Sequence, residues 1–190
     1  MNKVIILNGC PGIGKDTIGC MVADMNLGMG VRMLSFKAPM FDIARAMLGD
    51  EGYESSLFLY EDRRYKEQPS DLLGGLSPRN FMIWISETMM KPRFGDDYFG
   101  RRMVEAVKSD SSTAIITDGG FPEETIALIK AGIQVHVCRL HREGFTFAGD
   151  SRNYLHIPDW LGVNGYSEID LDLIDNDPLH TAIQITGLYL

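Results

Sequence analysis

A glycine-rich stretch near the start of the chain, "LNGCPGIGKDTIGC" (7–20), restricts the fold more than any other feature. It follows the apolar run "KVIILN" (3–8) and leads directly into residues with helical spacing. Its letters match G-x-x-x-x-G-K, a pattern in which glycines let successive backbone N–H groups point at one anion and the lysine reaches the outer phosphates. The helix that opens here adds the positive end of its dipole. The stretch therefore predicts a phosphate-binding loop; the alternative is a turn that binds nothing.

Apolar runs alternate with helical patterns along the rest of the chain. Continuous apolar strands are typical of a sheet that is covered on both faces, and alternation with helices indicates parallel strands joined by right-handed crossovers. We therefore predict a three-layer α/β fold with a five-stranded parallel sheet. The expected strands are 3–8, 31–36, 113–118, 133–140 and 169–175, and the expected helices are 15–27, 39–48, 78–90, 97–109, 122–131 and one from about 178.

Length and composition fit one ordinary domain, 1–190, with 45% hydrophobic and 23% charged residues. No apolar run is long enough for a membrane span or a signal peptide, which predicts a cytoplasmic protein with no membrane partner. Three cysteines without C-x-x-C spacing indicate reduced thiols. The net charge of −8 argues against a protein that coats nucleic acid by general attraction, although basic residues gather locally. Two stretches without clear periodicity, 49–76 and 141–168, are long enough to be functional lids.

The residue after the lysine is the unusual member of the loop, because Asp16 stands where a Ser or Thr normally follows. Thr17 would then supply the hydroxyl nearest to Mg²⁺, and Asp16 is a second candidate for the metal. Asp118 ends the apolar segment "AIITD", where a carboxylate can hold a metal-bound water beside the loop. The alternative for Asp118 is a turn-forming residue before "GG".

These segments and their order resemble the phage-type deoxynucleoside monophosphate kinases and their P-loop relatives. The resemblance rests on "GKDT", "LSFKAPMFDIARAMLG", "LSPRNFMIWISETMM", "GDDYFGRRM", "ITDGGFPEE" and "VHVCRL". It implies a nucleoside monophosphate kinase-like fold, ATP with Mg²⁺, and a nucleotide acceptor. It also implies an acceptor-side insertion at about 37–93 and a lid over ATP at about 141–155. The phosphates of ATP are expected on Gly9, Pro11, Gly12, Ile13, Gly14, Lys15, Asp16 and Thr17.

One departure from this family bears on the acceptor. Members that phosphorylate free nucleotides typically carry D-x-R-F at the third strand, whereas this chain has "DGGF" (118–121) and so lacks the arginine. The stretch "REGFTFAGDSRNYL" (142–155) is similar to phage kinases that phosphorylate the hydroxymethyl group of 5-hydroxymethyluracil within DNA. A neutral hydroxyl acceptor benefits from a carboxylate that takes its proton, and a monophosphate does not need one.

We therefore expect a hydroxymethylated DNA base as the acceptor and Asp118 as the base. The alternatives are a free deoxynucleoside monophosphate, or a nucleotide-binding switch that is not a kinase. A host cytoplasm follows if the chain is phage-encoded, and a homodimer is left open. The expected catalytic residues are Lys15, Asp118, Arg139 and Arg152, and the expected acceptor-binding residues are Lys37, Asp42, Arg63 and Arg79.

Overall fold

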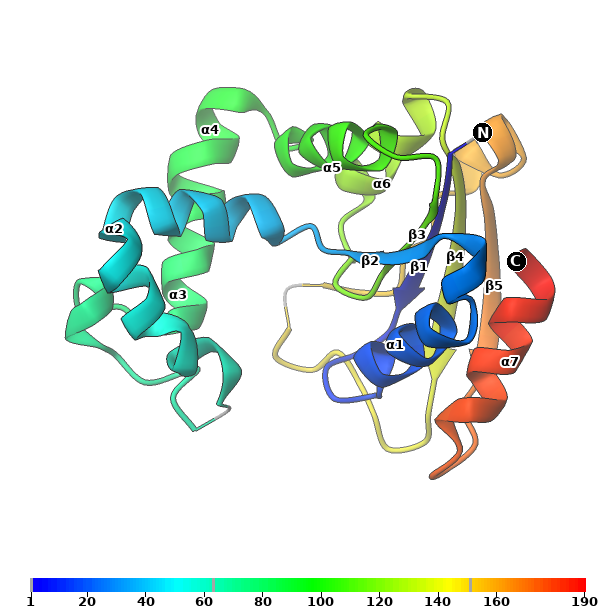
Figure 1. Ribbon diagram of the computed structural model, residues 1–190, viewed down its shortest axis with the longest axis horizontal. Coiled ribbons are helices and arrows are strands. Elements are labelled where there is room, and N and C mark those ends of the chain that lie inside the picture. Colours follow the sequence, from blue (N-terminus) through cyan, green and yellow to red (C-terminus); the bar gives the residue numbers. More distant parts are fainter. Residues whose placement is uncertain (1, 63, 151) are drawn as a thin grey trace. The chain divides into compact units, whose positions relative to one another are not determined.

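The computed structural model describes residues 2–62, 64–150 and 152–190, and the chain divides into two compact units, each described by itself. The first unit comprises Met1–Phe36 and Phe99–Leu190 and contains one sheet with the strand order β2-β3-β1-β4-β5 (Figure 1). Every neighbouring pair of strands is parallel, which confirms the predicted five-stranded parallel sheet. The strands are β1 (Lys3–Asn8), β2 (Val31–Leu34), β3 (Thr113–Ile116), β4 (Gln134–His141) and β5 (Ser167–Asp172).

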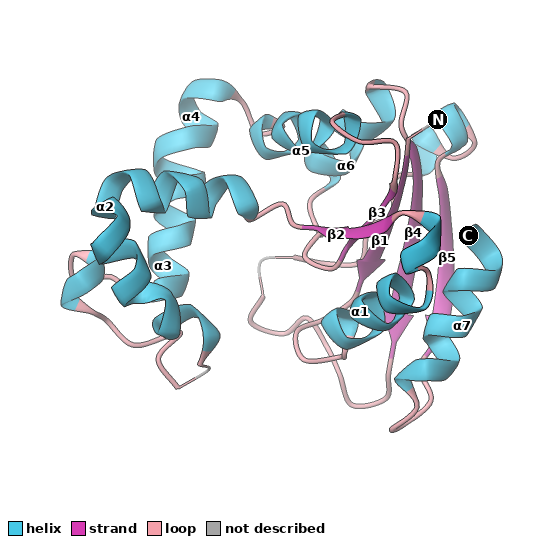
Figure 2. Ribbon diagram, in the orientation of Figure 1, coloured by secondary structure: helices cyan, strands magenta, loops and turns pink. Residues whose placement is uncertain are grey.

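Helices cover both faces of this sheet (Figure 2). Because side chains alternate along each strand, the buried strands place apolar side chains on both faces, and each face needs a cover. In β1, Val4 and Ile6 face a core shared with α5 and α6, whereas Ile5 and Leu7 face a core shared with α1 and α7. The three layers of the predicted α/β fold are therefore present. The helices of this unit are α1 (Lys15–Met25), α5 (Tyr98–Lys108), α6 (Pro122–Lys130) and α7 (Pro178–Tyr189), with short 3-10 helices at Leu27–Met29, Pro158–Trp160 and Val163–Gly165.

The second unit, Lys37–Tyr98, is helical throughout its regular structure. Its small core consists of Ala44, Leu59, Leu73, Phe81 and Ile85. The helices are α2 (Ala38–Glu61), α3 (Pro78–Ile83), which continues through a π-helical segment (Trp84–Met90), and α4 (Lys91–Phe94), with a 3-10 helix at Asp71–Leu73. This unit covers nearly the same residues as the predicted acceptor-side insertion, whose role stays a prediction.

The prediction that 49–76 is irregular was wrong for its first part, because α2 continues to Glu61. Gly49 lies inside this helix with φ 71° and ψ 164°, so the two halves meet at a kink. A kink changes the direction of the apolar face, and a single 3.6-residue period therefore does not run through both halves. The helix starts were predicted well: Pro122 opens α6, and Asp177 caps α7 by accepting a hydrogen bond from the His180 N–H at 3.0 Å.

Of the residues described, no helix has the length and hydropathy that crossing a membrane requires.

Candidate functional site

The glycine-rich loop joins β1 to α1, and two of its glycines adopt conformations that favour glycine. Gly12 has φ 81° and Gly14 has φ 106°, both in the left-handed region. Gly14 is also the N-cap of α1, and its carbonyl oxygen accepts a hydrogen bond from the Ile18 N–H at 3.0 Å. A Cβ atom at Gly9 would lie 3.1 Å from the Leu140 carbonyl oxygen, so the loop packs closely against β4. This geometry fits the phosphate cradle that the sequence predicts.

The Lys15 side chain is folded over the loop. Its ammonium donates to the carbonyl oxygens of Gly9 at 2.6 Å and Cys10 at 2.8 Å, and the residue is 8% exposed. Burial lowers the pKa of Lys15, and the positive charge of Arg152 lowers it further. A buried ammonium needs acceptors, and here the loop's own carbonyls provide them. Phosphate oxygens on the same loop would be stronger, charge-assisted acceptors for it.

The end of β3 is tied to α1 by a pair that sequence reasoning missed. Thr117 donates from Oγ1 to Oδ1 of Asp16 at 2.5 Å. Gly19 permits this close approach, because a Cβ atom there would lie 2.7 Å from Cγ2 of Thr117. Strand geometry could have pointed to Thr117, because successive side chains of a strand alternate between its two faces. Thr117 directly precedes Asp118, so the two side chains leave the strand on opposite faces.

Asp118 is fixed on the other face of β3. Its Oδ2 accepts a hydrogen bond from the Ser35 hydroxyl at 2.6 Å, and its Oδ1 accepts one from the Phe36 N–H at 3.1 Å. The carboxylate therefore ties the end of β3 to the residues that follow β2.

Arg152 is held by Asp150 in a two-pronged ion pair. Its Nε and Nη2 donate to Oδ1 and Oδ2 of Asp150, each at 2.9 Å, and the Asp150 side chain is only 5% exposed. This bonding raises the pKa of Arg152, as do the negative charges of Asp118 and Glu124 nearby. Arg152 also acts electrostatically on Lys15. Three of the four predicted catalytic residues, Lys15, Asp118 and Arg152, thus belong to one electrostatic group.

The Arg152 stem packs on Gly120. A Cβ atom at Gly120 would lie 2.8 Å from Cδ, 2.9 Å from Cγ and 3.0 Å from Cβ of Arg152. The "DGGF" turn lacks the arginine that the family pattern expects, yet an arginine from a later segment lies against it.

Asn8 anchors that later segment and was also missed by sequence reasoning. It is 1% exposed, and its Oδ1 accepts a hydrogen bond from the Leu155 N–H at 2.8 Å. Its amide group donates to the carbonyl oxygens of Gly119 at 3.4 Å and Asn153 at 3.3 Å. The sequence could have indicated Asn8, because it places an amide at the end of the apolar run of β1, and a buried amide needs hydrogen-bond partners.

Arg139, the fourth predicted catalytic residue, lies in a different network. It pairs with Glu168 at 2.8 Å and with Asp170 at 2.7 Å, both on β5, and donates to the Leu155 carbonyl oxygen at 3.2 Å. Glu168 is almost fully buried, and its Oε1 accepts from the Tyr166 hydroxyl at 2.7 Å. These contacts give Arg139 a structural role, and its part in catalysis stays a prediction.

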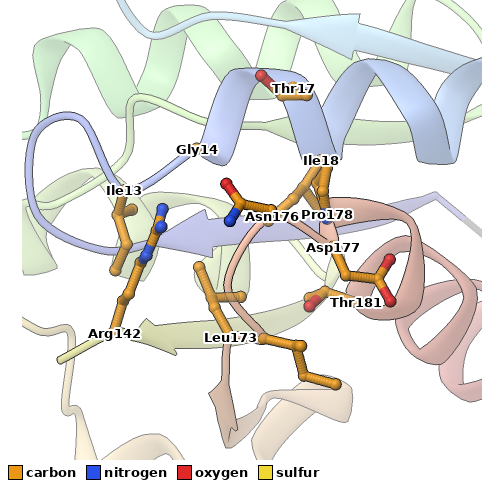
Figure 3. A pocket seen from close by; sticks show the side chains of 11 residues that line it. Ile13, Gly14, Thr17, Ile18, Arg142, Leu173, Asn176, Asp177, Pro178 and Thr181 are labelled. Atoms are coloured by element: carbon orange, nitrogen blue, oxygen red, sulfur yellow. The ribbon is translucent and has the colours of Figure 1, made fainter.

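A pocket of about 190 Å³ lies beside the loop (Figure 3). The amide of Asn176 is directed toward the space between Arg142 and α1. Thr181 is fully buried, and its Oγ1 lacks a hydrogen-bond partner among the described residues. The pocket therefore lies between the glycine-rich loop and the start of α7. Its lining residues are Ile13, Gly14, Thr17, Ile18, Arg142, Leu173, Ile174, Asn176, Asp177, Pro178 and Thr181.

The predicted acceptor-binding residues belong to the second unit. Lys37 directly precedes α2, Asp42 lies within it, and Arg79 in α3 donates to Glu67 at 2.6 Å. Arg63 lies outside the described residues. Their roles stay predictions.

The predicted metal residues, Asp16 and Thr17, are both exposed at the start of α1. Within the described ranges, no group of three or more His, Cys, Asp or Glu side chains is arranged to hold a metal ion. Mg²⁺ is commonly bound by one or two protein oxygens together with waters and substrate phosphates, so these residues fit a metal that arrives with a nucleotide.

Comparisons with known proteins support the fold and extend no further. No family model matches the sequence, and no curated protein matches it. Among solved structures, the protein APE1195 is 16% identical with a TM-score of 0.51, over 98% of this chain and 94% of that chain. A sugar kinase from Janibacter sp. HTCC2649 has a TM-score of 0.48 at 16% identity, over 100% of this chain and 96% of that chain. An APS kinase from Mycobacterium tuberculosis has a TM-score of 0.46 at 15% sequence identity, over 98% of this chain and 96% of that chain.

The class that the fold and the site define is an α/β protein with a parallel five-stranded sheet and a glycine-rich loop between the first strand and the first helix. At these identities the likeness to solved structures concerns this fold alone.

Proposed function

We propose that the chain is an ATP-dependent kinase that transfers the γ-phosphoryl group to the hydroxymethyl group of 5-hydroxymethyluracil in DNA. The observation that carries the proposal is the group of Lys15, Arg152 and Asp118 beside the glycine loop. Phosphoryl transfer depends on positioning and on neutralising charge that spreads over the transferred group, and two fixed cations serve that need. Bound ATP with Mg²⁺ would supply the phosphoryl group.

The loop residues 9–17 hold the phosphates in this proposal. Their backbone N–H groups face the anion, and Lys15 exchanges the carbonyl oxygens of Gly9 and Cys10 for phosphate oxygens. Arg152, held in place by Asp150, neutralises the transferred group without reorganisation. The pocket lined by Asn176 and Thr181 receives the base and sugar of the nucleotide.

Asp118 favours a hydroxyl acceptor. A neutral hydroxyl must lose its proton as it attacks, and a carboxylate in reach can take it. The bonds from Ser35 and Phe36 fix the Asp118 carboxylate in one orientation. Gly119 and Gly120 add no cationic side chain for a second phosphate group.

A free deoxynucleoside monophosphate is the second candidate acceptor, and the contact between Arg152 and Gly120 favours it. This contact brings a cation to the turn where the family pattern places its arginine. An acceptor phosphate is already anionic, so Asp118 would not be needed as a base.

The test is transfer of labelled γ-phosphate from ATP to two oligonucleotides that differ only in carrying 5-hydroxymethyluracil or thymine at one position. The four free deoxynucleoside monophosphates are assayed in parallel. Label on the hydroxymethylated strand alone supports the proposal, and label only on a free monophosphate refutes the DNA acceptor. Lys15→Ala should remove transfer in either case. Asp118→Asn should slow transfer about 10²-fold or more to a hydroxyl and far less to a monophosphate.

A further inference from the structure

The contact between Asp16 and Thr117 exchanges two side-chain types. In phosphate-loop proteins generally, the loop supplies a Ser or Thr hydroxyl to Mg²⁺ and the end of a neighbouring strand supplies an Asp. Here the residue after the loop lysine is the carboxylate Asp16, and its partner directly after β3 is the hydroxyl of Thr117. The next residue, Asp118, bonds to Ser35 and Phe36 instead. Thr117 donates to Asp16 at 2.5 Å, so a carboxylate and a hydroxyl are paired here with their usual places reversed.

A carboxylate at this position has a physical consequence for any phosphate on the loop. Asp16 is the second residue of α1 and is exposed, directly after the lysine of a loop shaped to bind an anion. Its charge interacts with that of Lys15. Two like charges in such proximity repel each other, and a divalent cation between them reverses the sign of the interaction.

We infer that Asp16, oriented by Thr117, is the protein ligand of the Mg²⁺ that accompanies the nucleotide, directly or through one of the ion's waters. This inference rests on the proposed function only in taking a magnesium nucleotide as the ligand. Thr117 engages Oδ1 of Asp16 and thereby leaves Oδ2 to the cation. Mg²⁺ keeps several waters and takes few protein ligands, so one oriented carboxylate with nucleotide phosphates forms an adequate site. Thr117 is a positioning residue in this arrangement.

The arrangement makes the loop selective for the metal-bound form of a nucleotide. Without Mg²⁺, Asp16 opposes the binding of the phosphates. With Mg²⁺, the same carboxylate favours binding. A neutral hydroxyl at this position can favour binding of the magnesium-bound nucleotide, but it does not oppose binding of the metal-free one.

Equilibrium binding of ATP tests the inference without any measurement of transfer. Titration calorimetry is run once with excess EDTA and once with excess Mg²⁺. For Asp16→Asn we expect metal-free ATP to bind about tenfold tighter and magnesium ATP about tenfold weaker, as befits one exposed charge contact. For Thr117→Val we expect magnesium ATP to bind less tightly and metal-free ATP to bind as before. The matched control is Asp24→Asn, which removes the same charge from an exposed position about 12 Å further along α1 and should change neither affinity.

The reversed pair allows a second, constructive test. The double variant Asp16→Ser with Thr117→Asp restores the ordinary placement of hydroxyl and carboxylate. It should recover magnesium ATP binding to within about threefold of the unaltered chain, while Asp16→Ser alone should not. Thermal unfolding of each variant confirms that the fold is retained.

The outcomes separate this inference from the proposed function. If the unaltered chain binds ATP neither with nor without Mg²⁺, the nucleotide cradle itself is refuted. If it binds magnesium ATP and Asp16→Asn leaves both affinities unchanged, the cradle stands and the role of Asp16 is overturned. Failure of the reversed pair to exceed Asp16→Ser alone overturns the role of Thr117.

Discussion

Gly120→Ala should separate catalysis from stability, because its new methyl group meets the stem of a proposed catalytic arginine. The added Cβ atom would lie 2.8 Å from Cδ and 2.9 Å from Cγ of Arg152. The arginine tip is pinned by two 2.9 Å hydrogen bonds to Asp150, so the stem can move away only if that ion pair is strained or lost.

Two opposing effects on the free energy of unfolding partly cancel. Replacing glycine by alanine narrows the unfolded ensemble, which stabilises by about 0.4–1 kcal/mol, whereas overpacking costs about 1–3 kcal/mol. The free energy of unfolding should therefore fall by about 0–2.6 kcal/mol. A displaced Arg152 no longer neutralises the transferred group, and loss of one such preorganised donor costs about 10²-fold or more in rate. The signature is a large loss of transfer with little loss of stability.

A double-mutant cycle measures whether Arg152 carries the effect. Transfer rates and denaturant unfolding are compared for Gly120→Ala, Arg152→Ala and the double variant, with Gly28→Ala as a control because its Cβ atom would meet nothing within 4 Å. We expect Gly120→Ala to cost almost nothing further once Arg152 is absent. An equal loss in both backgrounds would refute the reasoning, since the methyl group would then act through some other contact.

Three further predictions concern stability and reactivity. Gly100→Ala should destabilise the fold by about 1–3 kcal/mol, since its Cβ atom would lie 2.8 Å from backbone atoms of α6, whereas Gly187→Ala in α7 meets nothing and should stabilise by about 0.5–1 kcal/mol in denaturant unfolding. Hydrogen bonds from Arg139 and then His141 lower the pKa of Asp170 from 3.8 to about 2. Its stabilisation is thus present above about pH 4 and lost as the pH falls toward 2, and Asp170→Asn should flatten the acid limb of the stability curve in that window. A thiol reagent should label one cysteine, Cys20, in the folded chain and all three after denaturation, because the other two are buried.

The sheet could be predicted from the sequence because its strands are continuous apolar runs. Residues 3–8 form β1 as predicted, and the other strands differ from their predicted bounds by a few residues. The shortfalls have physical causes. The segments 31–36 and 113–118 were predicted as strands to their last residue, but their ends, Ser35 and Asp118, turn toward each other and form a hydrogen bond instead of extending the ladder.

The conformation of the glycine-rich loop could be predicted because its determinants are local: glycines with positive φ and one lysine lie within a few residues of each other. Its binding of phosphate stays a prediction. Thr117 and Asn8 could also have been predicted as site residues, because the alternation of side chains along a strand assigns each residue to one face of the sheet. The kink at Gly49 could not be predicted, because a glycine inside a helical pattern is compatible with a continuous helix, a kinked helix or the end of a helix.

Arg152 was predicted as a catalytic residue, but its contact with the "DGGF" turn could not be predicted from the sequence. The sequence places no arginine in "DGGF", and position-by-position reasoning concludes that the turn has lost its cation. The structure provides one from 32 positions further along, and the glycine that marks the loss is what makes room for it. That placement depends on Asp150, which pairs with the tip of Arg152. It also depends on Asn8, whose side chain bonds to Asn153 and Leu155 directly after Arg152. Asn8 is followed in the sequence by Gly9, the first glycine of the glycine-rich loop. The start of the glycine-rich loop and the segment that follows Arg152 therefore share one support, the Asn8 residue. The position of the Arg152 charge is therefore set by contacts between residues far apart in the sequence, which is why the sequence of the turn alone could not place it.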